Sequence, residues 1–158
     1  MGNIFSGSEI VGLGVRIEEN GRDFYRVLSE KEHNPESRIM FEYLSGEEEK
    51  HIAVFKKILE RIERYEPPES YPGEYFAYMR ALAEGYVFTQ KDKGREMAIN
   101  IKSEKEALNL GIGFEKDSIL FYEGMKKAIP EYDHKVINEL IIQEQHHLSQ
   151  LLGLKGKL

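Results

Sequence analysis

The sequence contains no cysteine. Disulfides, thiolate catalysis, iron-sulfur clusters and cysteine-ligated zinc are therefore excluded, and any metal that this chain binds must be held by oxygen and nitrogen. Long apolar runs are also missing, and the mean hydropathy is -0.52, so no segment approaches the roughly 20 apolar residues that a membrane span needs. We expect a soluble protein with no membrane partner. Because no secretory signal is visible at the start, we expect a cytoplasmic location.

An excess of basic residues is lacking as well. The net charge is -6 and the sequence pI is about 5.5, which argues against nucleic acid as a partner, since such binding needs a basic surface. The length of 158 residues, 41% of them hydrophobic, suits one domain with a full core. We therefore predict a single domain over residues 1–158.

Capping residues and prolines divide the chain into four long predicted helices. In each of them apolar residues recur at steps of three and four, and no segment is typical of a strand. The predicted helices are 8–33, with Ser8 as the N-cap; 34–65, with Asn34 as the N-cap, Pro35 at the first helical position and Pro67-Pro68 beyond the end; 103–129, opened by a capping box of Ser103 and Glu106; and 133–153, begun near Asp133. The predicted fold class is all-α, a four-helix bundle.

The connection between the second and third helices is too long for a hairpin turn. Its length suits a crossover along the bundle that joins two helices pointing the same way. Tyr75, Tyr78, Met79, Leu82 and Tyr86 lie in it at helical spacing, which predicts a short extra helix whose aromatic stripe serves in packing.

The chain contains an internal repeat. Residues 14–25 align without gaps on residues 111–122, and residues 44–51 align on residues 140–147. Each half offers one glutamate on its first helix and one Glu-x-x-His on its second. Because residues three apart lie on the same face of a helix, both side chains of a Glu-x-x-His can reach one ion.

The Glu-x-x-His pattern is short enough to arise by chance, and the chain contains four copies. Two copies, Glu30/His33 and Glu131/His134, lie beside prolines at helix ends, where polar residues serve as caps and surface, and we interpret both as unrelated to a site.

The other two copies lie in apolar seams, because Glu48 and Glu144 have apolar residues four and seven positions away on both sides. Glu18 has apolar neighbours on its face too, whereas Glu19 has charged ones, so Glu18 is the residue predicted to face inward. Buried ionised carboxylates cost several kcal/mol each unless they are paired, and two metal ions would supply the compensating charge. The predicted ligands are Glu18, Glu48, His51, Glu115, Glu144 and His147.

Two tyrosines lie two helical turns beyond the glutamates of the first helix of each half. Tyr25 follows Glu18, and Tyr122 follows Glu115, each by seven residues on the same face. A phenol in this place either hydrogen-bonds a ligating carboxylate and takes part in catalysis from outside the ligand set, or is an ordinary core residue. The sequence leaves both alternatives open.

These motifs resemble the rubrerythrin branch of the ferritin-like di-iron carboxylate proteins over nearly the whole chain. The resemblance is carried by Ile17-Glu18-x-x-Gly21-x-x-Phe24-Tyr25, Leu44-x-x-x-Glu48-x-x-His51, Phe114-Glu115-x-x-x-x-x-Phe121-Tyr122 and Leu140-x-x-x-Glu144-x-x-His147. It implies a ferritin-like bundle with two iron ions, one bound by Glu18 and His51 and the other by Glu115 and His147. Glu48 and Glu144 would bridge them.

The chain departs from that family pattern in two places. Rubrerythrins proper carry a cysteine-ligated rubredoxin-like centre that feeds electrons to the di-iron site, so a chain without cysteine implies an external electron-donor protein as partner. They also tend to carry a further glutamate three residues beyond the first on the third helix, which lets an iron shift during turnover. Ser118 stands at that position.

The leading functional hypothesis is a di-iron oxidoreductase that reduces hydrogen peroxide or dioxygen. The alternatives are an iron-binding or ferroxidase protein of the storage type, and a non-catalytic bundle whose metals stabilise the fold. Manganese or a mixed Mn/Fe pair would suit the same ligands. The family resemblance also implies a homodimer or higher oligomer.

Overall fold

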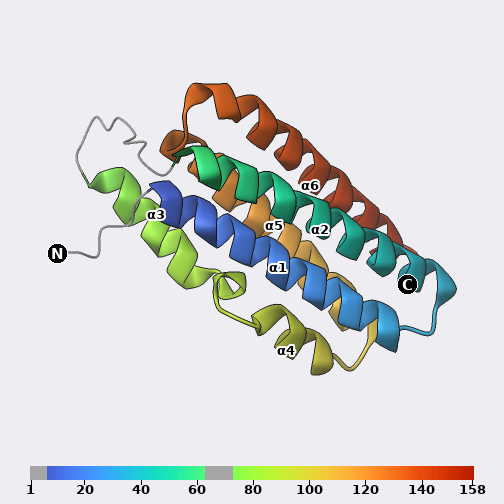
Figure 1. The fold of residues 1–158 in the computed structure, drawn as a ribbon. Coiled ribbons are helices and arrows are strands. Elements are labelled where there is room, and N and C mark those ends of the chain that lie inside the picture. Colours follow the sequence, from blue (N-terminus) through green and yellow to red (C-terminus); the bar gives the residue numbers. More distant parts are fainter. Residues whose placement is uncertain (1–6, 63–72) are drawn as a thin grey trace.

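Four long helices form the body of the structure, a computed structural model that describes residues 7–62 and 73–158 (Figure 1). The helices are α1 Gly7–Lys31, α2 Pro35–Ile62, α5 Glu104–Met125 and α6 His134–Lys155. Helices α1 and α2 pack as one hairpin, and α5 and α6 pack as the other. Every regular element in the described part of the chain is helical, so the all-α prediction is confirmed.

The predicted helix starts agree with the structure to within a residue or two. The Asn34 side chain accepts hydrogen bonds from the backbone N–H groups of Glu36 (3.0 Å) and Ser37 (3.4 Å), and Ser103 Oγ accepts one from Glu106 N–H (3.1 Å). Each bond satisfies a donor that the first turn of a helix leaves without a partner. Asn34 and Ser103 therefore act as caps in the fold, whereas Ser8, the predicted N-cap of the first helix, lies inside α1, which begins at Gly7.

The predicted helix ends agree less well. The third helix was expected to reach Ile129, but α5 ends at Met125, and the chain tightens there into a 3₁₀ turn, η2 Lys126–Ala128, before Pro130. A second such turn, η3 Glu131–Asp133, precedes α6. The expected end of the second helix at Tyr65 and its stop at Pro67-Pro68 lie outside the described residues.

The crossover contains more helix than the sequence predicted. It holds α3 Glu74–Gly85, the 3₁₀ turn η1 Val87–Thr89 and α4 Lys93–Ile99, of which only α3 was expected. Helix α3 lies against α5 and α4 lies against α1, and the crossover lets α2 and α5 run in the same direction (Figure 1). No helix among the described residues is long and apolar enough to span a membrane.

Helix α3 packs through the stripe that the sequence showed. Tyr75 donates a hydrogen bond to the carbonyl of Gly124 on α5 (2.6 Å), and Met79 is buried against the same glycine. A β-carbon at Gly124 would lie 2.6 Å from Met79 Sδ, so the Met79 side chain fills the space that the glycine leaves open. The stripe thus serves in packing, although Tyr78 is exposed.

Asn20 of α1 joins the crossover to the bundle. Its amide donates to the carbonyls of Phe88 (2.6 Å) and Gln90 (2.7 Å), and its Oδ1 accepts from Gly94 N–H (2.9 Å). A β-carbon at Gly94 would lie 1.9 Å from the Asn20 carbonyl oxygen, so α4 can meet α1 this closely only at a glycine. One buried side chain therefore satisfies three backbone groups of the crossover.

Replacement of this residue should destabilise the fold. We expect Asn20→Ala to lower the free energy of unfolding by about 3 kcal/mol, because buried backbone groups of the crossover lose their partners. Asn100→Ala is the matched control, since its side chain is exposed and makes one bond at the end of α4; it should cost under about 0.5 kcal/mol. Urea unfolding measures both, and equal losses would contradict the role of Asn20.

Candidate metal centre

The six predicted ligands meet in the middle of the bundle. Glu18 comes from α1, Glu115 from α5, and one Glu-x-x-His pair each from α2 and α6. All six side chains are buried, at 0–2% exposure. Glu18 lies within the buried stripe of α1, whereas Glu19 is half-buried, so the prediction of which glutamate faces inward is correct. The apolar residues above and below each carboxylate produce this burial, because they form the core-facing seam of each helix.

The potential ligand atoms form two groups. In one group the oxygen and nitrogen atoms come from Glu18, Glu48, His51 and Glu144, and in the other from Glu48, Glu115, Glu144 and His147. Within each group these atoms lie no more than 4.8 Å apart. Glu48 and Glu144 belong to both groups, so the arrangement suits two neighbouring ions that share two carboxylates.

Most of these ligand atoms have no hydrogen-bond partner in the protein. A buried polar atom that lacks a partner costs about 1–3 kcal/mol, and more if it is charged, so such a concentration of them in one place calls for a ligand. Oxygen and imidazole nitrogen are the donors that iron and manganese accept. The atoms are Glu18 Oε2, both oxygens of Glu48, His51 Nδ1, Glu115 Oε2, both oxygens of Glu144 and His147 Nδ1. The residues present therefore fit a pair of metal ions.

Tyr25 and Tyr122 each hold a carboxylate of the opposite half. Tyr25 on α1 donates to Glu115 Oε1 on α5 (2.9 Å), and Tyr122 on α5 donates to Glu18 Oε1 on α1 (2.5 Å). Each bond satisfies one oxygen of a carboxylate, and the other oxygen, Oε2 of Glu115 or of Glu18, has no hydrogen-bond partner in the protein. Both tyrosines thus hydrogen-bond predicted ligands, as one of the two alternatives required, and their part in catalysis stays a prediction.

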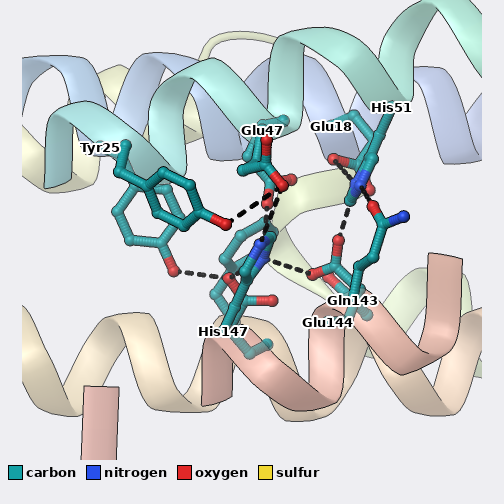
Figure 2. A network of polar contacts seen from close by, with 12 residues as sticks. Glu18, Tyr25, Glu47, His51, Gln143, Glu144 and His147 are labelled. Carbon is teal, nitrogen blue, oxygen red and sulfur yellow. Dashed lines mark hydrogen bonds and ion pairs between the residues drawn. The ribbon is translucent and has the colours of Figure 1, made fainter. Parts of the chain in front are cut away.

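The far sides of the two histidine rings contact residues that the sequence analysis did not single out. His51 Nε2 lies 2.6 Å from Gln143 Oε1, and His147 Nε2 lies 3.8 Å from Glu47 Oε1 (Figure 2). Both Nδ1 atoms thus face the carboxylates. The internal repeat could have pointed to Glu47 and Gln143, since these residues align with each other, one residue before Glu48 and Glu144.

Burial and mutual repulsion shift the acid–base behaviour of the cluster. Burial raises the pKa of Glu48 and of Glu115 well above the ordinary value, and the charge of Glu144 raises both further. Burial alone would lower the pKa of His51, but the charge of Glu18 and the ion-pair contact of His51 Nδ1 with Glu144 Oε1 (2.9 Å) outweigh it and raise the pKa to about 11. Without metal, these side chains therefore hold protons that metal binding must displace.

The remaining candidates lie away from the cluster. Glu30 and His33 are exposed at the end of α1, and His134 Nε2 lies 3.1 Å from the carbonyl oxygen of Ile129. Ser118, at the position where the family tends to carry a further glutamate, is buried and shares a hydrogen bond with the hydroxyl of Tyr86 (2.9 Å). Neither extra Glu-x-x-His belongs to the site, as expected.

The fold and the cluster together define a helical bundle with a di-metal carboxylate site. The family model for rubrerythrin matches residues 9–155, and the chain therefore belongs to the rubrerythrin family. A solved structure of a ferritin-like diiron-carboxylate protein from Thermotoga maritima is similar, with 31% identity, a TM-score of 0.72, and coverage of 95% of this chain and 94% of that one. The ferritin-like fold prediction is thereby confirmed. No curated protein sequence matches the chain.

The metal-free protein should lose stability as the pH rises from 6.5 toward 11. Folded His51 keeps its proton to about pH 11, whereas the unfolded chain loses it near 6.5, so the folded state binds more protons in this window and rising pH favours unfolding. The raised pKa values of Glu48 and Glu115 act in the same direction above their ordinary range.

Thermal unfolding of chelated protein at pH 7 and pH 9 measures this dependence. The protein should melt at a lower temperature at pH 9, and His51→Gln should show a smaller difference between the two pH values. An unchanged difference in the variant would contradict the contribution of His51.

Proposed function

We propose that the chain is a di-iron oxidoreductase that reduces hydrogen peroxide or dioxygen with electrons from an external donor protein. The observation that carries the proposal is the buried cluster of four glutamates and two histidines, whose unsatisfied atoms fall into two groups joined by Glu48 and Glu144. Two ferrous ions held there would supply, as they become ferric, the two electrons that, with two protons taken up from water, convert one hydrogen peroxide into two waters.

Burial of the site limits what can react there. The six proposed ligands are at most 2% exposed, so a substrate has to be small, as peroxide and dioxygen are. The described residues provide no further redox group near the cluster, and the sequence has no cysteine to hold one. An external donor therefore has to return the centre to its reduced state after each turnover.

The tyrosines serve as positioning groups in this proposal. Burial raises the pKa of Tyr25 and of Tyr122 well above the ordinary value, and the charges of Glu115 and Glu18 respectively raise them further. Both phenols thus stay protonated and continue to donate to Glu115 and Glu18. They orient these carboxylates toward the ions.

Metal content and reaction with peroxide test the proposal. Anaerobically purified protein should contain about two iron ions per chain by elemental analysis, and the double variant Glu48→Ala/Glu144→Ala should lose them because both shared carboxylates are gone. Peroxide should rapidly oxidise the reduced native protein. Glu30→Ala/Glu131→Ala is the matched control, since it removes two glutamates of the unrelated Glu-x-x-His copies and should keep the iron.

The outcomes separate the competing functions. Fewer than one metal ion per chain, unchanged in the double variant, would contradict the site. Growth of an iron mineral without catalytic turnover would favour storage, and global unfolding on chelation without peroxide reactivity would favour a structural role. Manganese in place of iron would retain the site and change the metal.

Removal of either phenol should slow the reaction more than it reduces metal content. We expect Tyr25→Phe and Tyr122→Phe to retain two ions per chain but to react with peroxide about tenfold more slowly, because a ligating carboxylate loses the group that orients it. Stopped-flow oxidation of the reduced protein measures the rate. Tyr75→Phe, which removes a hydroxyl that donates to the Gly124 carbonyl away from the cluster, is the control, and an equal loss there would contradict the assignment.

A further inference from the structure

Each histidine of the centre is supported from the other half of the repeat. Gln143 on α6 reaches His51 on α2, and Glu47 on α2 reaches His147 on α6. Gln143 and Glu47 occupy equivalent places, one residue before Glu144 and Glu48. Their chemistry differs, however, because one is a neutral amide and the other a carboxylate.

The two metal positions, one with Glu18 and His51 and the other with Glu115 and His147, are alike in their other features. Each position has one glutamate and one histidine of its own and shares Glu48 and Glu144 with its neighbour. Glu18 and Glu115 each accept one tyrosine hydroxyl. The formal charge of the two ligand sets is therefore equal, and a difference between the positions has to come from residues outside them.

From the difference between Glu47 and Gln143 we infer that the two metal positions differ in affinity for a metal ion. Glu47 makes the position of His147 and Glu115 the tighter one, and this position fills first. The inference rests on the proposed di-metal site. Both Nδ1 atoms face the cluster, so an ion there leaves Nε2–H of each ring directed at Gln143 or Glu47. A carboxylate behind an imidazole makes the ring a stronger donor to a cation, whereas an amide chiefly orients it.

Glu47 acts mainly through its charge. Its Oε1 lies 3.8 Å from His147 Nε2, which is an ion-pair distance and longer than a hydrogen bond. The side chain is only 15% exposed, so water screens this interaction weakly, whereas its partner Lys50 is 77% exposed and its opposing charge is screened strongly. A net negative charge thus remains beside His147.

The Glu47 side chain is held in place by its own helix. Tyr43 donates to Glu47 Oε1 (3.4 Å), and Lys50 donates to Glu47 Oε2 (3.1 Å). The Tyr43 ring also meets the His147 ring edge-on, with centroids 6.0 Å apart. The carboxylate is therefore fixed beside His147 before any metal arrives, and no rearrangement is needed for it to act.

Stepwise titration of metal-free protein with Co²⁺ under anaerobic conditions tests the inference. Visible absorption and calorimetry resolve the two binding steps, which should differ at least tenfold in dissociation constant in the native chain. Glu18→Ala leaves only the His147 position complete and should reproduce the tighter step. Glu115→Ala leaves only the His51 position complete and should reproduce the weaker one.

Exchange of the supporting residues provides the decisive variants. Glu47→Gln gives both histidines an amide and should weaken the tighter step about tenfold. Gln143→Glu gives both a carboxylate and should strengthen the weaker step, and the double exchange should reverse the order of filling. Glu49→Gln is the matched control, because it removes a carboxylate from the same turn of α2 that pairs instead with Arg22, and it should leave both steps unchanged.

The outcomes distinguish this inference from the function on which it rests. Two Co²⁺ ions bound with equal affinity, or steps that Glu47→Gln does not alter while helix content by circular dichroism stays native, would overturn the inference alone. A native chain that binds fewer than two Co²⁺ ions would overturn the di-metal centre and the inference with it.

Discussion

The placement of four carboxylates in the middle of a protein core is the constraint on which the rest of this structure depends. Charged groups removed from water are costly unless they meet opposite charge, and only two histidines accompany Glu18, Glu48, Glu115 and Glu144 in the cluster. Protons lessen the imbalance in the metal-free chain, as the raised pKa values of Glu48 and Glu115 show. Two cations would remove it fully. The surrounding apolar seams therefore have to hold the helices together against local repulsion until the ions arrive.

The two halves of the internal repeat build the carboxylate cluster together, because each half supplies hydrogen bonds and ligand atoms to the other. Tyr25 of the first half holds Glu115 of the second, and Tyr122 of the second holds Glu18 of the first. Gly21 of the first half lies closely against Phe114 of the second, whose ring tip occupies the place that a β-carbon would take. Neither half could assemble a di-metal site alone, because each group of ligand atoms takes residues from both halves.

Local signals made the helices and the six clustered residues predictable from the sequence. The caps at Asn34 and Ser103 depend on neighbouring residues only, and the choice of Glu18 over Glu19 depends on the periodicity of a single helix. Features that depend on distant residues were missed. Helix α4 is short and has little periodicity of its own; it is held by Lys31, which donates to the carbonyls of Ala98, Ile99 and Ile101. The pairing of Glu47 with His147 likewise appears only after α2 and α6 pack together.

The crossover also contacts Ser118. Tyr86 is the residue directly after α3. Its hydroxyl donates to the Phe114 carbonyl (3.0 Å) and shares a hydrogen bond with Ser118 Oγ. Its ring stacks on Phe88 of η1. Where the family pattern would place a further glutamate, this chain therefore has a serine bonded to a buried aromatic side chain. An ion that left its histidine would find no carboxylate at this position. In the proposed centre the ions would then stay in fixed places, and a difference between the two places would come from residues such as Glu47 and Gln143.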